Sequence, residues 1–357
     1  MALLTIASGL AHLLLARTLN VPQGADAPAY VRIAETLLAT GGVELPPPGL
    51  LRPSPQERLD DVFGSPLSRA VDGRFLPKHP VPFGALLVPG VALAGVAGAR
   101  LTALLLGALL AGTVTAAATR TYGAVPSTLA SAAVFLLSPA GRNVLWAINV
   151  DTVITLAWFG ALLLAEAGRP VGAGLLGGAV LFLRPPAGLL LAGPALLAAT
   201  RGRRDLLLFA LGALPPAAIF AATNVLLWGS PWGSSYDRVV VVREGVVALA
   251  DHAGRFSLPP LRGLSLLLLD EAGGLAATAP AALVGLLGLL LPGGSRRRLG
   301  LAAAVSAALF LVFLSPFEFL ERLPSTIYRF ALPLLAASVL PLAALVRAAL
   351  DLRRTRA

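Results

Sequence analysis

The sequence predicts an all-α polytopic membrane protein with about ten transmembrane helices. Of its 357 residues, 57% are hydrophobic and only 13% are charged, whereas soluble domains carry about 45–50% apolar and about 25% charged residues. The mean hydropathy is +0.81, and apolar runs of about 20 residues, long enough to cross a bilayer, recur along the chain. These observations exclude an ordinary soluble protein and also a disordered one, which would be rich in charge. We expect residues 1–357 to form a single integral membrane domain.

The chain opens with an apolar segment, Ala2–Leu19, which is the first predicted span. It lacks a charged n-region and a clear cleavage site, so we expect an uncleaved span and not a signal peptide. A polar loop, Asn20–His79, follows and holds seven of the 18 acidic residues. Inside this loop, Ala27–Ala39 is expected to form a short juxtamembrane helix that begins after Asp26 and ends before Gly41.

The other predicted spans lie between this loop and the C-terminus, and a second hydrophilic loop, Gly229–Glu271, interrupts them. Their expected ranges are Leu101–Thr119, Val125–Pro139, Thr152–Ala167, Gly172–Leu183, Gly188–Ala199, Leu206–Trp228, Leu275–Leu291, Leu299–Leu314 and Phe330–Leu350.

Two segments leave the topology open. Pro82–Gly98 is apolar but broken by prolines and glycines, so it either lies along the membrane surface or crosses it. Gly172–Ala199 is split by Arg184 and two prolines. As one helix at about 1.5 Å per residue it would exceed about 40 Å and place an arginine near mid-membrane, at a cost of several kcal/mol. Two short helices that meet at a water-filled pocket fit better, because irregular backbone at membrane depth needs a cavity beside it.

The charge pattern indicates an orientation. The net charge is +10, and Lys78 is the only lysine among 28 basic residues. If Pro82–Gly98 does not cross and Gly172–Ala199 crosses twice, both termini face the cytoplasm and both hydrophilic loops, 20–79 and 229–271, lie outside. Nine clustered arginines then fall inside, as the positive-inside rule requires: Arg201, Arg203, Arg204, Arg296, Arg297, Arg298, Arg353, Arg354 and Arg356. The opposite choice for both segments leaves these clusters inside as well.

Several classes of partner and site are excluded or disfavoured. The basic residues belong to no soluble domain, so no nucleic acid is expected as a partner. The chain has no cysteine and three histidines, which excludes disulfides and Cys-based metal sites and disfavours a His-rich one. The sequence contains no Walker loop, HExxH, GxSxG or dinucleotide-binding motif. The expected location is a bacterial-type cytoplasmic membrane.

Two candidate sites flank the first loop. Asp26 and Tyr30 are four residues apart and therefore share one helix face. Asp26 is either a general base at the mouth of a membrane cavity or only the N-cap of its helix. Lys78 and His79 stand where the loop returns to the membrane. They either bind a phosphate, with lysine as a compact cation, or extend to the interface as isolated polar side chains.

Further polar residues stand at span ends. Asp151 either faces a cavity, as functional intramembrane acids do, or caps a helix, and Arg142 lies shortly before it. Arg184 either contacts a phosphate at the outer surface or pairs with a buried carboxylate or backbone carbonyls. Arg329 begins the last span and either joins the same site or anchors the interface. Tyr236 belongs to a stretch of aromatic and small polar residues suited to sugar stacking or to an interfacial belt.

Taken in order, these motifs resemble the GT-C superfamily of glycosyltransferases that use polyprenyl-phosphate sugars, especially the protein O-mannosyltransferases and lipid A aminoarabinose transferases. The family's acid and tyrosine after the first span match Asp26 and Tyr30, and the acid that opens its fourth span matches Asp151. The resemblance also covers Lys78-His79-Pro80, Arg184-Pro185, Asn224 to Tyr236, and Tyr328-Arg329. Two positions depart from it, since Ala27 stands where many relatives have a second acid and Val81 interrupts a diproline.

The resemblance implies a GT-C-like fold with juxtamembrane helices in the long outer loop, a surface-lying Pro82–Gly98 and a twice-crossing Gly172–Ala199. It also implies an enzyme that moves a sugar, a mannose-like hexose or similar, from a polyprenyl phosphate to a hydroxyl of a glycan, lipid or protein acceptor on the outer face. Membrane lipids are the other expected partners. No cofactor is expected, and Ala27 leaves a divalent cation unsupported.

In this interpretation Asp26 accepts the acceptor's proton, with Asp151 as the second candidate base. Substrate-binding roles fall to the remaining candidates, among which the cations stabilise the departing phosphate: Tyr30, Lys78, His79, Arg142, Arg184, Tyr236 and Arg329. The alternatives are a transporter or lipid flippase that uses the same cavity without cleaving a bond, and a scaffold or assembly subunit.

Overall fold

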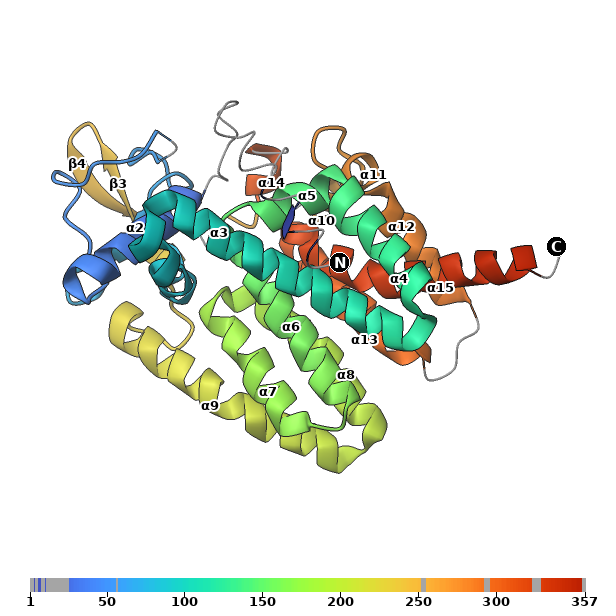
Figure 1. Cartoon of the computed structure of the whole chain (residues 1–357). Helices are drawn as coiled ribbons and strands as arrows, with labels where there is room; N and C mark the ends of the chain where they lie inside the picture. The colour runs from blue at the N-terminus through green and yellow to red at the C-terminus, as the bar shows by residue number, and fades with distance from the viewer. Residues whose placement is uncertain are drawn as a thin grey trace.

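The structure is a computed structural model and describes residues 26–55, 57–251, 255–291, 296–322 and 329–354, with Leu3, Ile6, Ala7 and Leu10. The predicted first span, Ala2–Leu19, lies outside the described residues apart from those four. Helices make up most of the described chain, and a small sheet lies at one end (Figure 1). The described chain is therefore mostly helical, as predicted, but the sheet departs from the all-α class that the sequence predicted.

The predicted juxtamembrane helix is present as α2 (Ala27–Thr40). It ends because Gly41 adopts a left-handed conformation, with φ of 69°, and donates its backbone N–H to the carbonyl of Leu37. The buried face of α2 includes Tyr30 and Ile33 and packs against the start of α3 (Val81–Tyr122). The first residue of α2 is thereby held beside the end of the polar loop that precedes α3.

Helix α3 bends sharply within the ambiguous Pro82–Gly98 segment. The backbone leaves helical geometry at Ala94 and Gly95, which brings Gly90 into contact with Gly98. A Cβ on Gly98 would lie 1.8 Å from the carbonyl oxygen of Gly90, so this approach requires glycine. The first part of α3 is therefore a separate helical arm that packs on α2 and does not continue straight into the long apolar part.

The next helices are shaped by bends and caps. Helix α4 (Ala124–Ser131) continues as a π-helical turn and then meets α5 (Pro139–Trp146) at an angle of 75°. After α5 the chain enters α6 (Val150–Glu166). The N-cap of α6 is Asn149, whose side-chain oxygen accepts a hydrogen bond from the backbone of Thr152 at 3.1 Å.

The predicted break at Arg184 is confirmed. Helix α7 (Pro170–Gly178) runs through a 3-10 turn up to Phe182, and a second 3-10 turn from Pro185 leads into α8 (Ala192–Arg201). Arg184 between them is extended, with φ of −162°. The two halves run antiparallel, because Arg201 at the far end of α8 donates to the carbonyl of Glu166, which precedes α7, at 3.0 Å.

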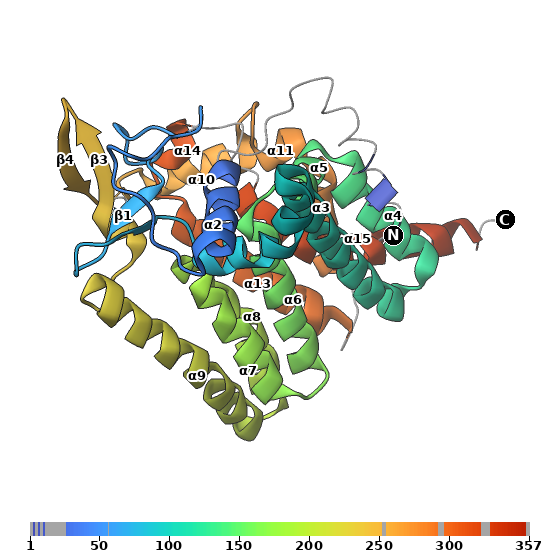
Figure 2. The same cartoon turned by 60° about the vertical axis from the view of Figure 1, so that its left-hand side comes forward.

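The remaining helices complete the bundle (Figures 1 and 2). They are α9 (Arg203–Trp228), α10 (Pro260–Leu269), α11 (Leu275–Thr278), α12 (Pro280–Leu286), α13 (Arg296–Leu314), α14 (Phe319–Arg322) and α15 (Leu332–Arg354). Within the described ranges, α3, α9, α13 and α15 are each long and apolar enough to cross a membrane, and α4 with α5 forms a bent fifth candidate. The ten spans expected from the sequence stay a prediction.

The two hydrophilic loops form a four-stranded antiparallel sheet, which the sequence analysis did not predict. Its strand order is β2-β1-β3-β4, with β1 (Leu67–Arg69) and β2 (Phe75–Pro77) from the first loop and β3 (Val239–Arg243) and β4 (Val246–Ala250) from the second. The β3–β4 turn at Glu244-Gly245 has positive φ at both residues, as tight two-residue hairpins prefer. The sheet joins the two loops into one layer beside α2 (Figure 2).

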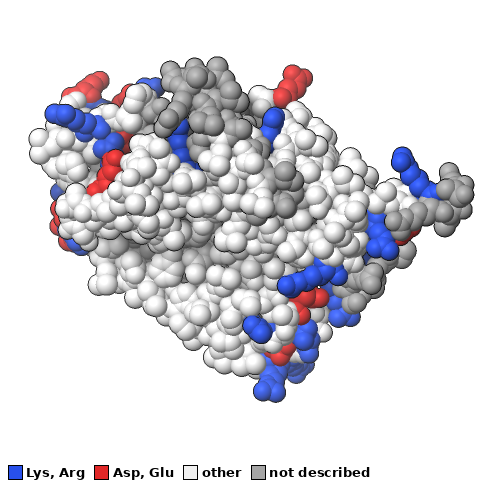
Figure 3. Space-filling model, viewed as in Figure 1, with Lys and Arg blue, Asp and Glu red and all other residues white. Residues whose placement is uncertain are grey.

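Charged side chains are distributed unevenly over the surface. In Figure 3 they gather toward the sheet and toward the opposite end of the molecule, and a wide band between them carries almost none. Arginines begin α9 and α13 and end α15. An uncharged band between two charged ends is the surface that a bilayer-spanning bundle needs.

Candidate active site

Segments far apart in the sequence meet at a cavity of about 360 Å³ near the sheet. The sheet and the arm of α3 position the loop residues, since Ser235 Oγ, just before β3, donates to the carbonyl of Lys78 at 2.6 Å. The remaining site residues lie at breaks between helices or next to helix ends. Six of the nine predicted site residues line this cavity: Asp26, Lys78, His79, Arg184, Tyr236 and Arg329.

Asp26 forms an ion pair with Arg329 at the cavity. Its Oδ2 lies 2.7 Å from Nη1 of Arg329, and the two side chains are 18% and 13% exposed. Although Asp26 occupies the N-cap position of α2, its side chain makes no capping hydrogen bond, so the capping interpretation is wrong. Burial alone would raise the pKa of the Asp26 carboxyl, but the combined positive charges around it, with Arg329 as the largest contributor, outweigh burial and hold the pKa well below its usual range.

A second ion pair joins Asp151 to Arg184. Nη1 of Arg184 lies 2.9 Å from Oδ1 of Asp151, and Nη2 lies 3.5 Å from Oδ2. Asp151 does not cap α6, because Asn149 does, so that interpretation is also wrong. Asp151 is 2% exposed and does not line the cavity, which it reaches through Arg184. Arg184 thus pairs with a buried carboxylate, which is one of its expected contacts.

Phe330 links the two pairs. The guanidinium carbons of Arg184 and Arg329 lie 5.0 and 4.9 Å from the centre of its ring. Arg329 also lies 5.3 Å from the ring of Phe319. Contacts of this kind are each worth about 0.5–2 kcal/mol. They hold both guanidinium groups at one side of the cavity while leaving their N–H groups for carboxylates or an anionic ligand.

Lys78 is buried and not extended to an interface. Its side chain is among the largest that are fully buried, and Nζ donates to the carbonyls of Phe63 at 2.7 Å and Val62 at 3.2 Å. Burial lowers the pKa of the Lys78 ammonium to about 8. An ammonium has three N–H donors, so one remains beyond these two bonds.

His79 and Tyr236 line the cavity, and Tyr30, which does not line it, packs against His79. The His79 ring contacts Tyr30 at 5.3 Å and Tyr236 at 6.5 Å between ring centres. Burial lowers the pKa of His79 to about 3, so the ring is neutral near pH 7. Burial also raises the pKa of Tyr236 to about 12, which keeps its hydroxyl protonated. The Tyr30 hydroxyl is buried and, within the described part of the chain, has no hydrogen-bond partner.

Arg142 is the predicted residue that the structure keeps away from the site. It is exposed on α5 and does not line the cavity. No three His, Asp or Glu side chains gather in a possible metal site within the described ranges.

The sequence analysis missed an aromatic wall. Rings of Phe256 and Phe317 stack at 5.1 Å, and those of Phe317 and Phe319 at 5.8 Å. Six of the chain's 14 phenylalanines line the cavity: Phe63, Phe256, Phe313, Phe317, Phe319 and Phe330. The concentration of four of them between residues 313 and 330 was the available signal.

No family model matches the chain, and no curated protein sequence matches it. Among solved structures it is similar to ArnT from Cupriavidus metallidurans bound to undecaprenyl phosphate, with a TM-score of 0.58 and 15% identity over 96% of this chain and 59% of that chain. The apo structure of the same protein matches with a TM-score of 0.52 and 17% identity over 93% of this chain and 58% of that one.

The likeness extends over nearly the whole chain, which therefore has the ArnT fold, as the predicted resemblance to GT-C enzymes implied. The chain spans about three fifths of the length of ArnT.

Proposed function

We propose that this chain is a membrane glycosyltransferase that moves a sugar from a polyprenyl-phosphate donor to an acceptor hydroxyl. The observation that carries the proposal is the cavity in which a carboxylate, Asp26, faces a group of cations beside an aromatic wall. Undecaprenyl phosphate bound to ArnT, which has the same fold, supports a donor of the same class.

The charges at the cavity suit a phosphodiester. Three cations, Arg184, Arg329 and Lys78, line the cavity together with two carboxylates, Asp26 and Asp237. Asp151, outside the lining, pairs with Arg184. The lining alone therefore carries one positive charge in excess, which the single negative charge of a sugar phosphodiester would balance. Charge-assisted hydrogen bonds from guanidinium groups to phosphate are about twice as strong as neutral ones. The same groups would stabilise the second negative charge that develops on the leaving phosphate.

In the reaction that we propose, Asp26 accepts the proton of the acceptor hydroxyl. The hydroxyl oxygen bonds to the anomeric carbon, the bond from that carbon to the phosphate oxygen breaks, and the electron pair leaves with polyprenyl phosphate. Arg329 depresses the pKa of Asp26, so the paired carboxylate is a weak base. Donor phosphate that takes over the hydrogen bonds of Arg329 would raise this pKa and strengthen the base when substrate is present.

The aromatic wall supports a role in binding the carrier lipid. The stacked rings of Phe256, Phe317 and Phe319 lie beside the cations. Isoprene units are apolar and unsaturated, and aromatic rings offer them a large contact area. The phosphate would then face Arg184 and Arg329 while the first isoprene units contact the phenylalanines.

We also propose that this cavity opens on the outer face of a bacterial cytoplasmic membrane, that the chain crosses the membrane ten times and that both termini are cytoplasmic. The arginines that begin α9 and α13 lie one helix length from the cavity and the sheet. The positive-inside rule assigns that arginine-rich end to the cytoplasm.

Release of polyprenyl phosphate tests the function. Purified protein in detergent is incubated with a polyprenyl-phosphate hexose labelled in the lipid, with cell-envelope glycans and lipids as acceptors. We expect lipid phosphate to form, and to form far more slowly with Asp26→Asn than with Asp72→Asn, a control at an exposed acid in the first loop. Uptake of the intact labelled lipid into vesicles without cleavage would instead indicate a flippase.

A further inference from the structure

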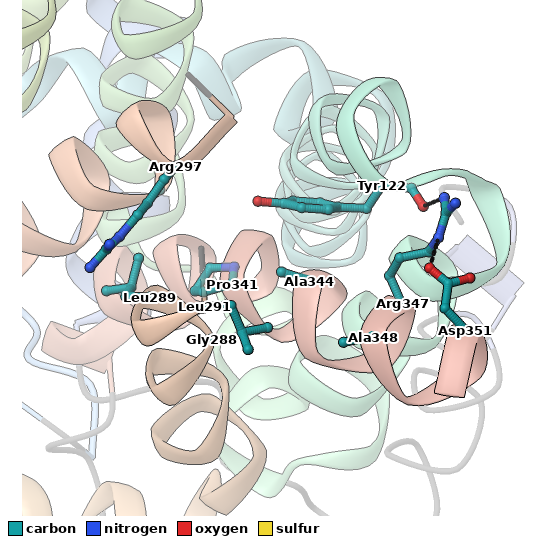
Figure 4. A pocket seen from close by; sticks show the side chains of 11 residues that line it. Tyr122, Gly288, Leu289, Leu291, Arg297, Pro341, Ala344, Arg347, Ala348 and Asp351 are labelled. Atoms are coloured by element: carbon teal, nitrogen blue, oxygen red, sulfur yellow. Dashed lines mark hydrogen bonds and ion pairs between the residues drawn. The ribbon is translucent and has the colours of Figure 1, made fainter. Parts of the chain in front are cut away.

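A second cavity, of about 480 Å³, lies between the 3-10 turn Leu287–Leu290 that follows α12, the helices α13 and α15, and the end of α3 (Figure 4). Its lining combines two arginines, Arg297 and Arg347, with Tyr122 and an apolar floor formed by Leu289, Leu291, Pro341, Ala344 and Ala348. None of these residues belongs to the candidate active site.

This cavity is at the opposite end of the bundle from the active-site cavity. Helix α13 reaches from Arg297 at this cavity to Leu314 at the other, and α15 returns from the Phe330 side to Arg347. Each stretch of about 17 residues measures about 25 Å at 1.5 Å per residue, close to the thickness of a bilayer's hydrocarbon core. The second cavity therefore lies at headgroup level of the other membrane face.

The two arginines differ in the contacts that their side chains make. Arg347 is fixed, because its Nε lies 2.9 Å from Asp351 Oδ2 and its Nη1 donates to the carbonyl of Tyr122 at 3.2 Å. Arg297 is exposed and has no ion-pair or hydrogen-bond partner within the described part of the chain. Among the described residues, Asp351 is the only acid in the lining, so these residues leave one positive charge uncompensated.

We propose that this cavity binds the headgroup of an anionic phospholipid from the leaflet opposite the active site. Basic pockets between transmembrane helices on the cytoplasmic side recognise anionic headgroups, and Arg297 is available for a phosphate. The apolar floor would contact the glycerol backbone and the first acyl carbons of the lipid. A free anion has no apolar part that could make these contacts. Tyr122 presents the amphipathic ring that is favoured at this depth, and in Figure 4 its hydroxyl points toward the side of α13.

A substitution at Gly300 tests the lipid-binding proposal without changing a charge. Gly300 lines the cavity, and a Cβ built there would make only ordinary contacts, the nearest being 3.6 Å from Leu289 Cδ2. Because a Cβ at this helical position meets only side-chain atoms, we expect a larger side chain to be accommodated there and to fill part of the cavity.

The binding test uses purified full-length protein in detergent. Dioleoyl-phosphatidylglycerol, dioleoyl-phosphatidylcholine or inorganic phosphate is added, and retained lipid is counted by native mass spectrometry beside the melting temperature. We expect phosphatidylglycerol alone to be retained and to raise the melting temperature. Removing a charge-assisted contact should weaken its binding at least about tenfold in Arg297→Gln. Arg298→Gln, an exposed neighbour that does not line the cavity, is the matched control and should bind normally.

Gly300→Leu should lose phosphatidylglycerol to a similar extent while its melting temperature without lipid stays near that of the parent. Equal effects of phosphatidylcholine, or of inorganic phosphate, would overturn the proposal, as would equal losses in Arg297→Gln and Arg298→Gln. The proposal does not depend on glycosyl transfer, so it stands or falls separately from the proposed function.

Discussion

Asp26 stands in a local sequence pattern that could be recognised, but its ion-pair partner lies far away in the sequence. The sequence predicted both its place at a helix start and its membership of the site, because an acid before an amphipathic helix is a local pattern. Its pairing with Arg329, 303 residues away, could not be predicted from residue type, and neither could the pairing of Asp151 with Arg184. Arg142 does not line the cavity, since closeness in sequence to Asp151 does not determine which side of α5 faces the cavity.

Replacing Asp26 with Asn should slow sugar transfer at least about a hundredfold, because a general base contributes about 10²–10⁴ in rate. The variant should also be less stable, by about 1–3 kcal/mol, since Arg329 keeps its charge in a largely buried position without its partner. Labelled-donor turnover and thermal unfolding in detergent measure the two effects.

The double variant Asp26→Asn, Arg329→Gln separates them. It should recover much of the lost melting temperature, because no orphaned charge remains, and yet stay inactive. A single Asp26→Asn variant with near-normal turnover would show that Asp26 is not the base, and Asp151→Asn would then be the variant to measure.

The low pKa of Lys78 predicts a pH-dependent donor affinity. In the folded protein the ammonium loses its proton as the pH rises through about 8, and an anionic phosphate would stabilise the protonated form. The dissociation constant of polyprenyl phosphate should therefore rise between pH 7 and 9, by up to about tenfold. Binding titrations over this range with the parent and with Lys78→Gln provide the check. A parent that binds equally well at both pH values, or a Lys78→Gln variant with the same pH dependence, would contradict this role.

At the scale of elements, local sequence features predicted where helices end and break. The sequence did not predict which distant strands pair. Helix α2 and the break at Arg184 follow from caps, glycines and prolines, which act within a few residues. The sheet depends on β1 pairing with β3, where Ser68 faces Val239, and no local pattern encodes that partner. The sequence analysis therefore placed the valine run of β3 within a predicted loop.

The bend in α3 gives an element-scale prediction. Gly98→Ala places a methyl group against the backbone of Gly90, so the arm must shift, at a cost of about 1–3 kcal/mol for overpacking. Thermal unfolding should show a lower melting temperature. Ala97→Leu, at an exposed neighbouring position, is the control and should melt like the parent. An unchanged melting temperature in Gly98→Ala would mean that the arm is not packed as described.

For the whole molecule, the orientation can be tested by labelling introduced cysteines, since the chain has none of its own. Cysteines at Leu50 and Val246, both exposed near the sheet, should react with an impermeant maleimide in intact cells. One at Thr200, exposed in the last turn of α8, should react only after lysis. The reverse pattern would place the candidate active site at the cytoplasmic face.

The long separation of the paired charges has a consequence for biosynthesis. At about 5–20 residues per second, the ribosome adds Arg329 about 15–60 s after Asp26, which lies 303 residues earlier. Throughout that interval the emerging chain carries an acid at the membrane edge without its counter-ion, so Asp26 must stay hydrated. The pocket can close only when the last helix inserts, and a nascent chain released before that point would leave an open, charged gap that quality-control proteases can recognise.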